Sequence, residues 1–422
     1  MEYKLGKVST FYDSLHKTPK NYNIYGYPMV RVKDISTGFL DLSSCFNVSE
    51  DDYLEFSKKY KPQSGDIIIT RVGTYGNIAL VTNDKRFCLG QNTVILNVDK
   101  KIIDNKYLFY YLTSSMGQQQ IESKVTGSTQ KTISLKSLKE INIIRHNFYK
   151  EKQIGDLLYK IDNKINNNKQ IIANLEEISQ TLFKRWFVDF EFLDENGNPY
   201  KSSGGEMVES ELGEIPKFWN VEKAEDIYKI TIGKTPPRKL TELFSENEGI
   251  DWVSISDMKT EGMFINHTKE KIVEEGIINY KVKVVPKGSV LLSFKLTIGR
   301  VKITNKELTT NEAIAHFFSD NMHQLYTYLY LKNFNFEYLG NTSSIATAIN
   351  SKIVKKMPIL VPKQRILAKF INRVEPFMKS IDIVQCENIK LTQLRDTLLP
   401  KLMSGEIEIP DDIEVNEDEL SI

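Results

Sequence analysis

Residues Ile154–Trp186 read IGDLLYKIDNKINNNKQIIANLEEISQTLFKRW, and their apolar side chains recur in alternating steps of four and three. Eight of the ten seam positions are apolar, and such spacing over more than four heptads is typical of a coiled coil. As a helix the stretch would span roughly 48 Å, at about 1.5 Å per residue. The seam consists of Ile154, Leu158, Ile161, Ile165, Asn168, Ile172, Leu175, Ser179, Leu182 and Trp186.

A second seam of the same kind lies near the other end of the chain. It opens with steps of four, four and three, and Pro376 is expected to kink or restart its helix. Two similar long seams in one chain favour an antiparallel coiled coil, although each helix could instead pack only on its own globular domain. The positions are Ile366, Phe370, Val374, Phe377, Ile381, Val384, Asn388, Leu391, Arg395 and Leu398.

In one antiparallel register the two seams superimpose throughout, and the seam asparagines Asn168 and Asn388 face each other. A buried Asn pair can form a hydrogen bond, whereas a shift by one heptad would set each Asn against an aliphatic side chain. The pair is therefore expected to fix the register. The alternative is a parallel or separate arrangement with both asparagines solvated. The register pairs Leu158 with Leu398, Ile165 with Leu391, Ile172 with Val384, Leu175 with Ile381, Leu182 with Val374 and Trp186 with Phe370.

The second half of the chain repeats the first at a nearly constant offset. Gly26–Asp34 (GYPMVRVKD) matches Gly249–Asp257 (GIDWVSISD), and Gly65–Thr70 (GDIIIT) matches Gly288–Ser293 (GSVLLS) in the same register. A period this long indicates duplication of a whole domain with its trailing helix. Further matches are Thr74–Gly76 with Thr297–Gly299, Gly90–Asn92 with Thr310–Glu312, Lys139–Ile143 with Lys355–Ile359, and Thr181–Phe183 with Thr397–Leu399.

Short β-branched runs between Gly, Asn and Pro turns predict strands in both repeated domains, here called heads. We expect an α+β fold: two α/β heads in tandem repeat, separated by two long helices that form an antiparallel coiled coil. Asp194–Pro199 and Ser202–Gly205 predict an exposed turn and a flexible linker. The expected segments are head 1 (1–150), a long helix (151–190), a linker (191–211), head 2 (212–362), a second long helix (363–404) and an acidic tail (405–422).

The net charge of +1 hides an uneven distribution. Residues 405–422 carry eight acids and no base, and without them the chain has a net charge of +9. Residues 1–150 hold 21 Lys and Arg against 14 Asp and Glu, whereas residues 211–362 hold 20 against 18. Head 1 is thus the more obvious binder of a polyanion, although an ordinary lysine-rich surface explains the charge equally well.

Composition and the N-terminus bear on where the protein works. No apolar run reaches the length of a membrane span, and the N-terminal sequence resembles neither a signal nor a transit peptide. We therefore expect a cytoplasmic protein with no membrane association. Cys45, Cys88 and Cys386 are far apart and form no CxxC pair, which argues against a disulfide framework and a zinc site.

Sequence motifs of catalysis are absent. The chain contains no GxxxxGK[ST] loop, no Gly-rich dinucleotide fingerprint and no HExxH motif. Asn198–Tyr200 and Thr235–Arg238 both fall short of a catalytic Asn/Asp-Pro-Pro-aromatic tetrad. The five histidines show no ligand spacing, so we expect surface or structural roles and no metal site: they are His16, His146, His267, His316 and His323.

The order of head, helix, head and helix resembles the specificity subunits of type I restriction-modification systems over essentially the whole chain. Thr181–Phe190 (TLFKRWFVDF) closes the first helix, and Leu212–Trp219 (LGEIPKFW) opens head 2. Two further signatures are Gly233–Arg238 (GKTPPR) and Leu398–Gly405 (LLPKLMSG). Head 1 departs from the pattern because its sequence offers no counterpart of the Gly-Lys-Thr-Pro run.

The resemblance implies a non-catalytic reader of double-stranded DNA. Each head would be a target-recognition domain for one half of a split, asymmetric sequence, and the helices would set the spacer and dock two methyltransferase (modification) subunits. Two restriction translocase subunits would complete the complex. S-adenosylmethionine, ATP and magnesium would belong to those partners, so no cofactor is expected in this chain.

Loop residues of the types that contact phosphates and base edges are candidates for DNA binding. In head 1 they are Arg71, Thr74, Tyr75, Asn77, Gln91, Asn92, Ser128, Thr129, Gln130 and Lys131. In head 2 they are Lys234, Thr235, Arg238, Lys295, Thr297, Arg300, Asn311, Thr342, Ser343 and Ser344.

Two other functions remain open from the sequence. A self-contained modification or nuclease enzyme would need the motifs that the chain lacks. A coiled-coil scaffold with protein-binding heads would show no salt-dependent affinity for DNA.

Overall fold

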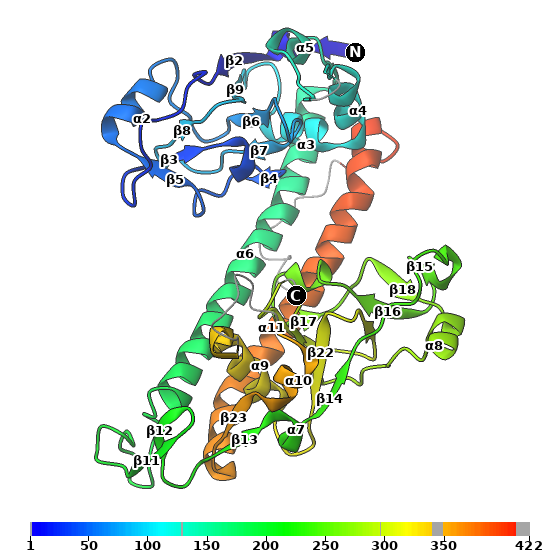
Figure 1. Cartoon of the computed structure of the whole chain (residues 1–422). Helices are drawn as coiled ribbons and strands as arrows, with labels where there is room; N and C mark the ends of the chain where they lie inside the picture. The colour runs from blue at the N-terminus through cyan, green and yellow to red at the C-terminus, as the bar shows by residue number, and fades with distance from the viewer. Residues whose placement is uncertain (1, 128–129, 296, 340–348, 411–422) are drawn as a thin grey trace. The chain divides into compact units, whose positions relative to one another are not determined.

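The computed structural model describes residues 2–127, 130–295, 297–339 and 349–410 (Figure 1). The chain forms two compact units. Unit 1 consists of residues 1–165 and 390–422, and unit 2 consists of residues 166–389. Each unit therefore contains one head together with a part of each long helix.

Head 1 is built on a five-stranded sheet in the order β2-β9-β6-β7-β4, in which only the β4–β7 pair is parallel. Ile67 and Ile69 face a core with the helix α3, while Ile68 faces a second core. The apolar run GDIIIT thus forms a strand because both of its faces are buried. The strands are β2 (Ser9–Asp13), β4 (Gly38–Phe39), β6 (Ile67–Thr70), β7 (Ile78–Leu80) and β9 (Thr93–Val98), and α3 spans Asn105–Thr113.

Head 2 repeats this sheet in the order β14-β22-β19-β20-β17, again with one parallel pair, β17–β20. Its helix α9 (Gln324–Asn333) occupies the place of α3 on the buried face that includes Val290 and Leu292. The tandem repeat expected from the sequence is therefore confirmed. The strands are β14 (Lys229–Ile232), β17 (Phe264–Ile265), β19 (Val290–Ser293), β20 (Val301–Thr304) and β22 (Ile314–Phe318).

Each head also has a small sheet, and the same arrangement of three strands occurs in both small sheets. The order is β5-β3-β8 in head 1 and β15-β18-β16-β21 in head 2, where β15 is additional. In head 1 the strands are β3 (Tyr27–Val30), β5 (Phe46–Val48) and β8 (Cys88–Leu89), and α2 (Glu50–Phe56) comes directly after β5. In head 2 they are β15 (Phe244–Ser245), β16 (Ile250–Val253), β18 (Glu270–Ile272) and β21 (Thr309–Thr310), with α8 (Glu274–Tyr280).

Each head is closed by an antiparallel strand pair and short helices. Head 1 pairs β1 (Glu2–Lys4) with β10 (Asn142–Ile144), and head 2 pairs β13 (Asn220–Lys223) with β23 (Pro358–Val361). In both heads the first strand leads into a one-turn helix, α1 (Leu5–Val8) or α7 (Ala224–Ile227). The other short helices are α4 (Ser115–Ser123), α5 (Leu135–Lys139) and α10 (Ser351–Lys356).

The duplication extends to single hydrogen bonds. Asp34 accepts the backbone N–H of Arg31 at 3.0 Å, and its counterpart Asp257 accepts that of Ser254 at 2.8 Å. One detail of the sequence alignment is wrong by a residue, because Leu89 pairs with Val30 as Thr310 pairs with Val253. Gly90 therefore corresponds to Asn311 and not to Thr310. The sequence alone does not fix the exact position of a loop deletion, because neither of these residues has a distinctive counterpart in the other head.

Two long helices, α6 (Phe148–Phe187) and α11 (Gln364–Ser404), carry the predicted seams. In unit 1 the beginning of α6 packs with the end of α11, and Leu158, Leu398 and Leu402 share one core. In the same unit, Nη1 of Arg395 donates a hydrogen bond to Oδ1 of Asp162 at 2.6 Å. The pair is thus antiparallel. The helix does not restart at Pro376, since α11 is continuous and both Val374 and Met378 are buried in the core of unit 2.

In unit 2 the end of α6 packs with the beginning of α11. Asn168 is 1% exposed, and its Nδ2 donates to Oδ1 of Asn388 at 2.9 Å and to Oε2 of Glu387 at 2.6 Å. The rings of Trp186 and Phe370 lie 5.6 Å apart. The predicted asparagine pair and its register are therefore confirmed, and Glu387 is a partner that the seam pattern did not reveal.

The segment expected to be a flexible linker is folded. Asp194 Oδ1 accepts the backbone N–H groups of Asn196 and Asn198, both at 2.8 Å. Phe192 is buried and stacks on Tyr200 and Trp219. β11 (Met207–Ser210) then forms a hairpin with β12 (Gly213–Pro216). Aromatic side chains on either side of the polar turn, Phe192 and Tyr200, hold it against the core. The Ser and Gly content of the segment alone did not reveal these contacts.

The three cysteines form no disulfide, and burial raises the pKa of Cys45 to about 11 and that of Cys88 to about 12. Within the described residues, no helix is long and apolar enough to cross a membrane. The same residues contain no group of three or more His, Cys, Asp or Glu side chains placed to hold a metal ion.

Candidate DNA interface

Most of the candidate residues of head 1 lie at one edge of its five-stranded sheet. β2 and β6 end there and β9 begins there, so their loops run side by side. The backbone N–H of Ser14 donates to Thr93 O at 3.2 Å, and that of Arg71 donates to Asn92 O at 2.8 Å. A bridge between Val72 and Thr132 adds the loop that contains Gln130 and Lys131. The edge thus brings together Arg71, Thr74, Tyr75, Asn77, Gln91, Asn92, Gln130 and Lys131.

Arg71 and Asn77 are held by partners near the base of these loops. Nη1 of Arg71 donates to both carboxylate oxygens of Asp13 at 2.7 Å, and its Nε donates to Ile133 O at 3.1 Å. The Arg71 side chain is only 16% exposed. Nδ2 of Asn77 donates to Ile35 O at 2.8 Å. Both residues shape the loop edge, while Thr74 is exposed on it.

Tyr75, Glu122 and Lys131 form an exposed polar cluster at the same edge. Nζ of Lys131 donates to Tyr75 Oη at 3.2 Å and to Glu122 Oε1 at 3.1 Å. The hydrogen bonds from Tyr75 and then Lys131 lower the pKa of Glu122, and those with Tyr75 and Glu122 raise the pKa of Lys131. Lys131 therefore stays positively charged near neutral pH.

Head 2 presents the equivalent edge. The backbone N–H of Gly233 donates to Ile314 O at 3.1 Å, and that of Phe294 donates to Ala313 O at 3.0 Å. Arg300 takes the place of Asn77, and its Nη1 donates to Ile255 O at 2.7 Å. The backbone N–H of Asn77 donates to Thr70 Oγ1 as that of Arg300 donates to Ser293 Oγ, both at 3.0 Å. This edge carries Lys234, Thr235, Arg238, Lys295, Thr297, Arg300 and Asn311.

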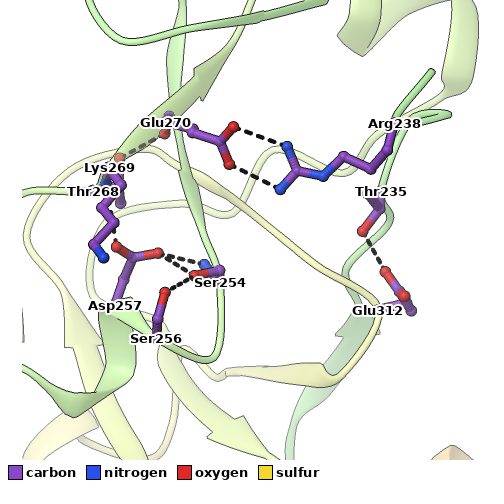
Figure 2. Close-up of polar contacts among 9 residues, drawn as sticks. All are labelled: Thr235, Arg238, Ser254, Ser256, Asp257, Thr268, Lys269, Glu270 and Glu312. Atoms are coloured by element: carbon purple, nitrogen blue, oxygen red, sulfur yellow. Dashed lines mark hydrogen bonds and ion pairs between the residues drawn. The ribbon is translucent and has the colours of Figure 1, made fainter. Parts of the chain in front are cut away.

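Carboxylates hold two of the candidates in head 2, as Figure 2 shows. Thr235 donates through Oγ1 to Glu312, and this hydrogen bond lowers the pKa of Glu312. Both Nη atoms of Arg238 donate to Glu270, at 2.9 and 2.8 Å. Neither Glu270 nor Glu312 was among the sequence candidates. A search for donors alone could not find them, since each acts through a partner distant in sequence.

The structure also gives head 1 a counterpart of the Gly-Lys-Thr-Pro run, which the sequence comparison missed. Ser14 follows β2 as Gly233 follows β14, with the same backbone hydrogen bond to the neighbouring strand. Lys17, Thr18 and Pro19 come shortly after Ser14. The extra residues before the lysine hid the match. The candidates Ser128, Thr129, Thr342, Ser343 and Ser344 lie outside the described residues.

What gathers at the two edges is a set of hydrogen-bond donors, amides and cations. Such groups contact phosphate oxygens and base edges in specific DNA complexes. The shared placement of these loops in both heads is the geometric basis of a candidate DNA interface.

Comparison with known proteins agrees with this fold. The family model for the type I restriction modification DNA specificity domain matches residues 1–177 and 216–393. The specificity subunit of the type I restriction enzyme MjaIX from Methanocaldococcus jannaschii is 27% identical, over 86% of this chain and 82% of its own length. That of HindI from Haemophilus influenzae is 25% identical, over 96% and 99%.

A solved structure shares the architecture. The type I restriction-modification S subunit from Mycoplasma genitalium superimposes with a TM-score of 0.59 over 98% of this chain and 96% of its own, at 18% identity. Because both halves of the chain match the family model, and each half forms the same head, the chain belongs to the type I restriction-modification DNA specificity family.

Proposed function

We propose that this chain is the non-catalytic subunit that gives a type I restriction-modification complex its DNA target. Each head reads one half of a bipartite, asymmetric sequence. The observation that carries the proposal is the repeated loop edge: the same strand ends present polar loops in both heads, yet the side chains differ, as Tyr75 and its counterpart Ile298 do. A repeated scaffold with different donors suits two different half-sites.

The helix pair has two roles in this proposal. It fixes the spacer between the half-sites, which the buried Asn168–Asn388 hydrogen bond supports because it allows one register. It also docks two methyltransferase subunits. Supporting this role, Ile171 and Ile178 of α6 and Ile383 of α11 are 45%, 44% and 66% exposed within unit 2. Aliphatic side chains exposed along a helix are suited to cover by a partner.

The chemistry of the complex would lie in the partners. We propose that the methyltransferase subunits bind S-adenosylmethionine, and that two restriction translocase subunits bind ATP and magnesium. This chain would then contribute target choice and geometry, and would work where those subunits meet DNA, in the cytoplasm.

Methylome sequencing of cells that express the chain with its methyltransferase subunit tests the proposal. The expected result is one methylated motif with two short defined parts and an unread gap of constant length. A single continuous motif would contradict two separate readers. Methylation without sequence preference, together with no salt-dependent DNA affinity of the purified complex, would instead support the protein-binding scaffold.

A further inference from the structure

Arg238 stands out among the loop residues because three separate contacts orient its guanidinium group. Both Nη atoms are bound by Glu270. The guanidinium carbon also lies 4.3 Å from the ring centroid of Phe244 and 4.3 Å from that of Trp252. Despite these contacts, the Arg238 side chain remains 48% exposed. It is therefore a cation that is both fixed in orientation and open to solvent. Figure 2 shows its two hydrogen bonds with Glu270.

The support for Arg238 belongs to the small sheet of head 2. Trp252 on β16 is 3% exposed and pairs directly with Glu270 on β18. The Thr268 hydroxyl donates to Glu270 O at 2.8 Å, which steadies the start of the strand. The two aromatic side chains, Phe244 and Trp252, and the Glu270 carboxylate all belong to strands of this sheet. An arginine held in this way loses little side-chain entropy when it binds a ligand.

The contacts leave one bidentate edge of the guanidinium unused. Glu270 takes one N–H from each Nη. Within the described part of the chain, Nε of Arg238 has no hydrogen-bond partner. Nε and the adjacent Nη can therefore donate a parallel pair of hydrogen bonds to two neighbouring acceptors. Guanine offers O6 and N7 in that arrangement in the major groove, whereas adenine sets a donor beside N7.

Electrostatics favours a base over a phosphate at this position. The Arg238–Glu270 pair has no net charge, and a phosphate oxygen approaching Arg238 would also approach the carboxylate. A guanine edge is neutral and meets no such repulsion. Lys234, Lys239 and Lys269 are exposed on neighbouring segments and carry the charge suited to phosphates.

We infer that Arg238, oriented by Glu270, Phe244 and Trp252, reads one guanine in the half-site of head 2. The inference rests on the proposed function. Glu270 is a positioning residue: it does not contact the DNA base but fixes the arginine that does. Head 1 has a related group in Arg31, which Asp34 holds and Phe46 covers at 4.0 Å, but the Arg31 side chain is only 15% exposed.

The test compares Arg238→Ala, Glu270→Ala and the control Arg365→Ala in the complex with the methyltransferase subunit. Arg365 forms an exposed pair with Glu195 at 2.7 Å outside the loop edge. Arg238→Ala should relax one guanine to any base, with a loss of about 10- to 100-fold in preference at that position. Glu270→Ala should relax the same guanine while it tightens binding to unrelated DNA, because it leaves an uncompensated cation. Arg365→Ala should leave the motif unchanged.

Each alternative outcome is distinct. An unchanged motif in Arg238→Ala overturns the inference and leaves the proposed function standing. A uniform loss of affinity with a smaller salt slope identifies a phosphate contact and also overturns it. If Arg238→Ala does not fold, as thermal melting would show, Glu270→Ala decides: an unchanged guanine preference refutes the inference. Absence of any motif for the wild-type complex refutes the proposed function itself.

Discussion

Replacing Asn168 with Ala should destabilise unit 2 because it removes two hydrogen bonds from a buried seam position. The bond to the Glu387 carboxylate contributes about 1.5–3 kcal/mol and that to Asn388 about 0.5–1.5 kcal/mol, so the two together contribute about 2–4.5 kcal/mol. The better helix propensity of Ala offsets about 0.5 kcal/mol of this loss. For a domain of this size class, each kcal/mol corresponds to a melting shift of about 2–4 °C.

Ser179→Ala is the matched control. Ser179 is also a polar seam residue of α6 and is 1% exposed, but its hydroxyl donates to Leu175 O of the same helix at 2.8 Å. Its loss should cost at most about 1 kcal/mol. Urea unfolding of both variants and of Asn388→Ala, with the double mutant completing the cycle, measures the coupling across the seam. If Asn168→Ala is as stable as Ser179→Ala, or the coupling is zero, the register argument is wrong.

Three further predictions follow from local geometry. Gly155→Ala should destabilise unit 1 by about 1–3 kcal/mol in urea unfolding, because the new Cβ would lie 2.6 Å from Asp104 Oδ1 and 2.7 Å from Tyr107 N. The control Asn163→Ala, at an exposed position of the same helix, should not destabilise it. Burial lowers the pKa of His316 to about 4 in the folded state, so as pH falls the unfolded chain binds a proton at His316 first. Unit 2 should therefore lose stability as pH falls from about 6.5 to 4. His316→Gln should flatten the dependence of the unfolding free energy on pH, and an unchanged dependence would contradict its origin in His316. Seven residues inserted into α6 and at the facing position of α11 add about 10 Å, or about three base pairs, and should change the methylated spacer or abolish methylation; an unaltered motif would refute the spacing role.

The long-range order of this fold was predictable where the sequence itself is periodic. The seam of α6 defines one face of a helix, and its single polar match with α11 defines the partner and register, so Asn168 and Asn388 could be paired in advance. The strands of the heads could be recognised because runs such as Ile67–Ile69 are apolar and β-branched, and the duplication confirms each run with a second copy.

The candidate interface was predictable only in part. The repeat identified loops at equivalent strand ends, and the structure brings most of them to one edge of each sheet. The sequence repeat could not distinguish Arg71, which is bound by Asp13, from Arg238, which is bound by a carboxylate yet exposed to solvent. Such contacts join segments far apart in sequence, such as Arg238 with Glu270 and Thr235 with Glu312, and follow no local period.

The central claim is that the two heads are independent readers, and exchange of one head tests it most directly. Residues 1–150 would be replaced by the corresponding segment of a specificity subunit with a different target, and the methylome of cells carrying the chimaera and its methyltransferase subunit would be sequenced. One half of the bipartite motif should change to that of the donor, while the other half and the spacer length stay the same. A change in both halves, or in neither, would contradict the account.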